Sequence, residues 1–355
     1  MIGELWWTRL VNSVRFIDDV CDALLDGESV MLMFKEEIPW RDIMVETIEQ
    51  KLLYNSDVRT VDTVDDSSIE NSPADYVLNN YCTPKEITDY WPLTHQSVGN
   101  YLARFVSTAF NSRYLCITGV KNSKNRASEW ITLAADYIEN IDSSQETGQF
   151  IFVVEDAGVT PSKHFTVFNY EDYVTDYDCM MLCLTMVSEL SCSRAEKMYL
   201  CEVASNIAGN NVENAALLIS EKTDLIKQPQ VVAKRVYREN GFDTEDLNPI
   251  VETALWEAQI SLVFPKIENY RTEIIRKYGK RIRKYLPIQG FYGEEVDNVE
   301  DLEIGQLYYI CYKESASPIV SKAENDMLFK MREARNLLAH CDILSYNQLK
   351  ELEVI

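Results

Sequence analysis

The chain has 355 residues, of which 46% are hydrophobic and 26% charged, which is typical of a globular protein with two or three domains. Its formal net charge of −23 excludes a protein that coats duplex DNA or an anionic membrane with its whole surface. No run of about 18 apolar residues predicts a transmembrane helix, and the first residues lack the pattern of a secretory signal. Nine scattered cysteines without a C-x-x-C pair predict reduced thiols in a cytoplasmic protein and no zinc site.

Helices and strands are predicted to alternate over the first half of the chain. A helical pattern of apolar residues at 14–25 precedes a continuous apolar run at 29–34, which is typical of a strand buried on both faces. Further strands are predicted at 58–64, 114–120, 150–155 and 164–168, and further helices at 39–53, 96–110 and 127–141. Because such alternation produces parallel sheets covered on both faces, this half is predicted to be α/β.

From about residue 171 onward the strand pattern stops and helices are predicted. The longest helical pattern runs from Ile250 to Tyr285, and a loop-rich segment follows at 287–298. The predicted fold class is therefore α/β followed by all-α, a parallel sheet flanked by helices and then a helical bundle. We predict boundaries near 175 and 243, which give an α/β domain at 1–175, a small helical region at 176–243 and a helical domain at 244–355.

The helix, the strand at 29–34 and the helix from Pro39 have the layout of a P-loop nucleotide-binding domain. A phosphate loop normally contains G-x-x-x-x-G-K-[ST], because glycines let backbone N–H groups wrap the phosphates and the lysine neutralises them. The corresponding segment, 35–42, has no glycine and no Lys-Ser/Thr pair, and it carries two carboxylates where phosphate would bind. Over roughly residues 10–240 the chain resembles the P-loop ATPase superfamily (AAA/STAND-like) without Walker motifs. The resemblance implies a domain that has lost ATP hydrolysis, needs no cofactor and survives as an interaction platform; an unrelated α/β fold is the alternative.

Polar residues near the ends of later strands are weaker candidates for a site. Lys121, Lys124 and Arg126 could meet phosphates, although a solvated loop is the simpler interpretation. Glu155 and Asp156 could bind a metal or position a partner protein. Because neither group has the spacing of a metal centre, we predict no metal site.

The segment Arg335-Asn336-Leu337-Leu338-Ala339-His340 is the part of the sequence that most resembles a functional motif. Apolar residues at spacings of three and four place it in a helix. Five residues separate Arg335 from His340, which corresponds to roughly 140° around a helix at about 100° per residue. The two side chains converge only if the helix ends near Ala339 and His340 folds back, or if a second copy of the helix meets the first across a two-fold axis.

This segment resembles the signature of the HEPN family, an arginine, a polar residue, a short spacer and a histidine near the end of a helix, and the resemblance extends over about residues 245–355. In active members it implies metal-independent RNA cleavage, with the RNA's own 2′-OH attacking the adjacent phosphate. His340 would then act as general acid or base, and Arg335 would stabilise charge on the phosphorane. Asn336 would orient His340 or the backbone. Sites in the family are commonly composite, which implies a homodimer; the alternative is a structural Arg–Asn–His network.

A cluster of cations in the long helix supports contact with RNA. In a chain of −23, it is an island of positive charge suited to a phosphate backbone, composed of Arg276, Lys277, Lys280, Arg281, Arg283 and Lys284. The alternative is a solvated helix face that pairs with the acidic remainder of the chain.

Two functions follow from these patterns. The first is a HEPN-type metal-independent ribonuclease, a toxin or anti-phage effector regulated by the degenerate nucleotide-binding-like domain. The second is a non-catalytic interaction subunit of a multi-protein bacterial defence complex, a hypothesis also motivated by Trp6 and Trp7, which look exposed in the sequence. The expected partners are RNA and either another protein or a second copy, with no membrane and no duplex DNA.

Overall fold

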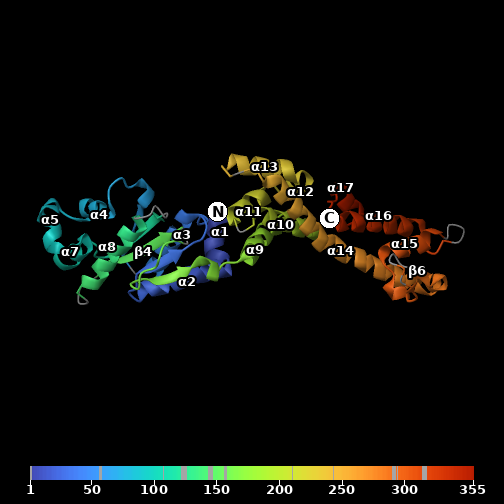
Figure 1. Cartoon of the computed structure of the whole chain (residues 1–355), viewed down its shortest axis with the longest axis horizontal. Helices are drawn as coiled ribbons and strands as arrows, with labels where there is room; N and C mark the ends of the chain where they lie inside the picture. Colours follow the sequence, from blue (N-terminus) through green and yellow to red (C-terminus); the bar gives the residue numbers. More distant parts are fainter. Residues whose placement is uncertain are drawn as a thin grey trace. The chain divides into compact units, whose positions relative to one another are not determined.

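A computed structural model describes residues 2–55, 58–106, 108–120, 126–142, 147–155, 158–209, 211–242, 244–289, 293, 295–313 and 318–355. The chain forms two compact units, Met1–Asp178 and Cys179–Ile355, called unit 1 and unit 2 below. Unit 1 contains a parallel sheet with flanking helices, and unit 2 is built mainly of helices (Figure 1). The predicted fold class is confirmed.

The sheet of unit 1 has five parallel strands in the order β2-β3-β4-β1-β5. The strands are β1 (Val30–Met33), β2 (Thr60–Asp65), β3 (Arg113–Val120), β4 (Gln149–Val154) and β5 (Thr166–Asn169), close to their predicted bounds. β4 is buried along its whole length and β3 along nearly all of it, as their continuous apolar sequences predict. One face of the sheet contributes to a core with residues of α4, α7 and α8, whose bounds follow.

The helices of unit 1 include several short ones in the segment 65–95, where the sequence pattern is mixed. Ser72 and Thr83 cap two of them, and a proline occupies the first turn of three, where its missing N–H costs nothing. The helices are α1 (Ile2–Arg9), α2 (Val11–Leu25), α3 (Arg41–Tyr54), α4 (Pro73–Tyr81), α5 (Pro84–Asp89), α6 (Pro92–His95), α7 (Val98–Phe105) and α8 (Arg126–Asn140), with short 3-10 turns η1 (Asp66–Ser68) and η2 (Tyr170–Asp172).

Unit 2 is organised around α14 (Leu247–Ile282), a helix of 36 residues that is about 54 Å long at 1.5 Å per residue. It is preceded by α9 (Asp176–Ser188), which begins in unit 1, and by α10 (Arg194–Ala208), α11 (Val212–Ser220), α12 (Thr223–Lys227) and α13 (Pro229–Glu239). It is followed by η3 (Arg283–Tyr285), the paired β6 (Ile288–Gln289) and β7 (Glu295–Val296), η4 (Val299–Asp301), α15 (Ile304–Lys313), α16 (Lys322–Ala339) and α17 (Tyr346–Glu351). Because α10 and α16 both pack along α14, the predicted 176–243 and 244–355 regions lie in one compact unit.

The register between α14 and α16 fixes the geometry of the C-terminal site. The indole Nε1 of Trp256 donates to the Leu338 carbonyl at 2.8 Å, and the Tyr270 hydroxyl donates to the Glu324 carbonyl at 3.1 Å. The two helices are therefore antiparallel, with the end of α16 beside the first third of α14. The buried Gln259 adds a further link, since its side chain accepts from the Leu344 N–H at 2.6 Å just after α16.

Candidate functional site

The first place to look for a ligand is the carboxyl edge of the sheet in unit 1. In open α/β sheets, ligands bind where the connections from neighbouring strands diverge. Here this position lies between β1 and β4, because the chain leaves β1 toward β2 and leaves β4 toward β5 on the other side. The segment 35–42, predicted to stand in place of a phosphate loop, begins at this edge.

Carboxylates of the chain itself occupy that position. The side chain of Glu155, just after β4, is 3% exposed, forms an ion pair with Arg41 at the start of α3, and accepts from the Ile38 N–H at 3.3 Å. The Lys35 N–H donates to Glu171 Oε1 at 2.7 Å. Two backbone N–H groups of this segment and the Arg41 guanidinium are thus already bound to carboxylates of the chain, where a phosphate would need donors.

The N-terminal helix α1 covers the same edge. Trp6 and Trp7 are each 1% exposed, so the expectation that they are exposed was wrong. The Trp7 indole donates to the Pro39 carbonyl at 2.9 Å, and the Trp6 indole donates to the Tyr170 hydroxyl at 3.2 Å. No local sequence pattern indicates this packing, because both acceptors lie far along the chain. The two rings therefore pack against Pro39 and Trp40 of the segment 35–42.

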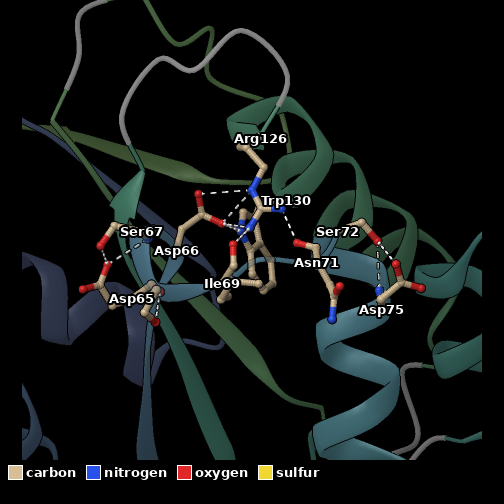
Figure 2. Close-up of polar contacts among 10 residues, drawn as sticks. Asp65, Asp66, Ser67, Ile69, Asn71, Ser72, Asp75, Arg126 and Trp130 are labelled. Carbon is tan, nitrogen blue, oxygen red and sulfur yellow. Dashed lines mark hydrogen bonds and ion pairs between the residues drawn. The ribbon is translucent and has the colours of Figure 1, made fainter.

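A second polar cluster lies at the carboxyl end of β2 (Figure 2). Asp66, 7% exposed, accepts from the Trp130 indole at 2.8 Å and from Arg126 Nε at 3.1 Å. Arg126 also donates to the Ile69 carbonyl at 3.1 Å and to the Asn71 carbonyl. Arg126 was a candidate phosphate ligand in the sequence, but its guanidinium is committed to a buried carboxylate and two carbonyls. It holds the loop between β2 and α4 in place.

The neighbouring Asp65 shapes the same loop. Its Oδ1 accepts from the Ser67 N–H at 3.0 Å and from the Ser67 hydroxyl at 2.7 Å. Gly119 passes so close that a Cβ there would lie 2.3 Å from Asp65 Oδ1, and its φ of +68° also favours glycine. This close approach fixes the loop and leaves no room for a ligand on that side of Asp65.

Groups that could hold a metal ion, and the state of the cysteines, can be given for the part of the chain that the structure describes. Within it, no group of three or more His, Cys, Asp or Glu side chains is placed to hold a metal ion. All nine cysteines are free thiols, and six of them are buried. The candidates Lys121, Lys124 and Asp156 lie outside the described residues.

The C-terminal motif lies at the end of α16, where the sequence placed it. The His340 N–H still bonds to the Leu337 carbonyl at 3.0 Å, so the backbone does not fold back at this residue. The next residue, Cys341, has a φ of +62°, and its N–H bonds to the Leu338 carbonyl, while the Asp342 N–H bonds to the Leu337 carbonyl. This double closure is a Schellman motif. Arg335 and the histidine therefore remain on different faces of the helix within one chain.

The three polar side chains of the motif are at least partly open to solvent, whereas Leu338 is buried. Arg335 is partly exposed and forms an ion pair with Glu303 at 3.2 Å, and its Nη1 lies 3.5 Å from Asn336 Oδ1. His340 is exposed, and no residue that the structure describes hydrogen-bonds to its imidazole. The described contacts thus include no closed Arg–Asn–His network, which was the structural alternative for this motif.

Two of the six predicted RNA-binding cations stabilise the start of α16. Arg281 donates to the carbonyls of segment 318–319 at 2.7 and 2.9 Å. Lys277 binds Glu324 at 2.7 Å, and Glu324 forms a capping box with Ser321. Burial alone would raise the pKa of the Glu324 carboxyl, but hydrogen bonds from Lys277, Ser321 and Tyr278 lower it to about 2. These cations are therefore part of the fold.

The other four cations are exposed and make no hydrogen bond or ion pair with any described residue. They are Arg276, Lys280, Arg283 and Lys284, called the cation stripe below. Arg276, Lys280 and Lys284 follow one another at spacings of four, and Arg283 lies three residues after Lys280, so the four share one side of the end of α14 and of η3. A row of unpaired cations on one helix face suits a phosphate backbone.

The structure separates this stripe from the motif. Trp256 contacts the end of α16, whereas Lys277 contacts its beginning. These two residues are 21 positions apart on α14, a distance of about 32 Å at 1.5 Å per residue. Within one chain the two features therefore lie at opposite ends of the α14–α16 pair, which the sequence could not show because the register depends on long-range packing.

In comparison with known proteins, no protein-family model and no curated protein matches the chain. Of the helices that the structure describes, none is both long enough and apolar enough to cross a membrane.

Proposed function

We propose that the protein is a metal-independent ribonuclease of the HEPN type, acting in the cytoplasm, whose site is completed by a second copy of unit 2. The observation that supports this most is the His340 imidazole, which is exposed at the end of α16 and hydrogen-bonds to no described residue. An imidazole that is exposed in this way is accessible to a substrate and can act on it as a general acid or base.

In the proposed reaction, the 2′-oxygen of a ribose attacks the adjacent phosphorus and the bond from phosphorus to the 5′-oxygen breaks. The products are a 2′,3′-cyclic phosphate and a 5′-hydroxyl. His340 removes the proton from the 2′-OH or supplies one to the leaving 5′-oxygen. Arg335 stabilises the charge on the phosphorane with its planar set of donors, and Asn336 orients the histidine or the backbone.

The geometry of α16 supports a composite site. Arg335 and His340 lie about 140° apart around the helix, so a single phosphate meets both most readily when they come from different copies. The ion pair between Arg335 and Glu303 is no obstacle, because exposed pairs contribute only about 0–1 kcal/mol and are easily exchanged for a phosphate.

Unit 1 acts in this proposal as a platform that contacts a partner or restrains the nuclease, without binding nucleotide. The ion pair of Glu155 with Arg41 and the packing of α1 over the sheet edge support a structural role for that edge. Resemblance to the P-loop ATPase superfamily then concerns the layout of the unit and not its chemistry.

The test is cleavage of mixed RNAs by the full chain in the presence of EDTA. We expect products with 2′,3′-cyclic phosphate ends, and a loss of about 100-fold or more in rate for Arg335→Ala and for His340→Ala. Lys322→Ala, an exposed cation at the first position of α16, is the matched control and should keep full activity. Equal rates in all variants, or no cleavage by the native chain, would sink the proposal.

A second candidate is a non-catalytic interaction subunit of a multi-protein bacterial defence complex. It is favoured by the 32 Å or so between the motif and the cation stripe, which argues against one compact nuclease site in a single chain. In that case the native chain binds RNA or a partner protein without cleaving RNA, and it co-purifies with that partner through surfaces that Arg335→Ala and His340→Ala leave intact.

A further inference from the structure

An aromatic surface extends across α15 and α16. The rings of Tyr308 and Tyr312 are stacked, with centroids 5.6 Å apart and planes at 27°. Phe329 of α16 lies 5.6 Å from the Tyr308 ring, and the guanidinium of Arg332 lies 5.4 Å from the same ring. Tyr312 is 62% and Phe329 45% exposed, so much of the ring area faces solvent. These four residues are called the aromatic platform.

The platform is continuous with the motif. Phe329, Arg332, Asn336 and His340 follow one another at spacings of three, four and four, which places them along one face of α16. Phe329 and His340 are 11 residues apart, or about 17 Å along the helix. The same face thus carries exposed aromatic rings at one point and the proposed catalytic histidine at another.

The charges around the platform favour a polyanion. Asp and Glu account for 57 of the 355 residues in the chain, yet Ile304–Lys313, the whole of α15, contains neither. Arg332 lies over the Tyr308 ring and forms an exposed ion pair with Glu333 at 3.7 Å, a kind of pair that contributes little and is easily exchanged for a phosphate. Tyr308 and Tyr312 have no carboxylate on their own helix, whereas Phe329 has Asp326 and Glu333 on α16. Exposed rings joined to an arginine form a surface on which nucleic-acid bases stack.

We propose that the aromatic platform stacks the bases of single-stranded RNA. This rests on the proposed function, because it identifies the RNA that the motif would cut as single-stranded. Any base presents a flat face to an aromatic ring, so the platform binds without strong sequence preference. Paired bases are covered by their neighbours, so a duplex cannot use the rings.

The features of unit 2 have a fixed order along the axis of α14. On α14, Lys277 contacts the beginning of α16 and Trp256 contacts its end. Phe329 and Arg332 of α16 therefore lie between these two levels. The cation stripe, the aromatic platform and the motif therefore follow one another along the axis of α14. A strand whose phosphates contact the stripe would reach the rings before it reaches His340.

The test is binding of a short, unstructured oligonucleotide with 2′-O-methyl riboses, labelled with fluorescein and followed by anisotropy. Its 2′-oxygen cannot attack, so binding is measured whether or not the chain cleaves RNA. We expect Tyr312→Ala and Phe329→Ala each to weaken binding by about 5-fold to 100-fold. Tyr312→Phe should keep the native affinity, whereas Tyr312→Leu, apolar but without a π face, should lose it. Tyr54→Ala, which removes a ring that is 90% exposed in unit 1, is the control and should bind normally.

Several outcomes would overturn the proposal that the platform stacks RNA bases. They are native affinity in a Tyr312→Ala/Phe329→Ala double variant, equal binding of single strand and duplex, or no binding by the native chain. Sedimentation decides the remaining alternative: if the double variant turns a dimer into a monomer and binds as tightly, the rings are an interface between copies. Ring-dependent binding together with an absence of cleavage would remove the nuclease function and leave this proposal intact.

Discussion

Cations lie both at the sheet edge of unit 1 and on the exposed surface of α14 and α16 in unit 2. They differ in whether a carboxylate of the chain already binds them. In unit 1, Arg41 and Arg126 are bound to the buried carboxylates of Glu155 and Asp66. In unit 2, the cation stripe is exposed and unpaired with any described residue. A buried, paired charge is costly to disturb, whereas an exposed one contributes little to stability and remains available to a ligand. The first set of cations therefore maintains the fold, and the second set is free to bind.

The largest expected effect comes from breaking the buried pair of unit 1. Asp66→Ala removes the acceptor of the buried Trp130 indole and the carboxylate that balances the Arg126 charge, which keeps only two carbonyls, so we expect a loss of about 3–5 kcal/mol in the free energy of unfolding. Tryptophan fluorescence during urea denaturation measures it. The matched variant Asp65→Ala removes the exposed carboxyl of the neighbouring residue. It should lower the free energy of unfolding by only about 1 kcal/mol. Equal losses in the two variants would show that Asp66 is not the anchor of the loop.

A smaller effect is expected at the carboxyl edge of the sheet in unit 1. Glu155→Ala removes the acceptor of the Ile38 N–H and of Arg41, and Arg41 can partly rehydrate, so we expect a loss of about 1–3 kcal/mol. Glu37→Ala, an exposed carboxylate in the same segment, should change stability by less than about 0.5 kcal/mol. Calorimetry should detect no ATP binding by the native chain. Nucleotide binding there would contradict the closed edge.

The smallest effect on stability, and the sharpest on binding, is expected from the cation stripe. Replacing Arg276, Lys280, Arg283 and Lys284 by Gln should change the free energy of unfolding by less than about 0.5 kcal/mol per site. The slope of log K against log salt for single-stranded RNA should fall by about 0.7 for each phosphate that the variant no longer neutralises. Lys234→Gln with Arg238→Gln, two exposed cations of α13, is the control. An unchanged slope in the stripe variant would place the RNA elsewhere.

Much of the fold followed from local sequence patterns. The apolar runs at 29–34 and 150–155 predicted strands close to their true bounds, and the end of α16 was predicted to within a residue or two. The short helices α4 and α5 were missed, although Ser72-Pro73 and the Thr83-x-x-Glu86 capping box are local signals that could have found them.

The parts of the site that could not be predicted all depend on contacts between distant residues. Nothing near Trp7 indicates that its indole meets Pro39, and nothing near Glu155 indicates that Arg41 is its partner. Periodicity could show which face of each helix is apolar, but not which neighbour that face meets. The chemical groups of both units could thus be read from the sequence, whereas their pairing required the tertiary structure.

The length of α14 sets the distance between the cation stripe and the motif. Its hydrogen-bonded backbone fixes how far the cation stripe lies from the level of Trp256, where α16 ends, and packing along its flank prevents that span from shortening. An oligonucleotide that contacts both the cation stripe and the motif of one chain must therefore span about 32 Å, whatever its sequence. Fragments too short for that span would engage only one end, so the helix itself would select substrates by size.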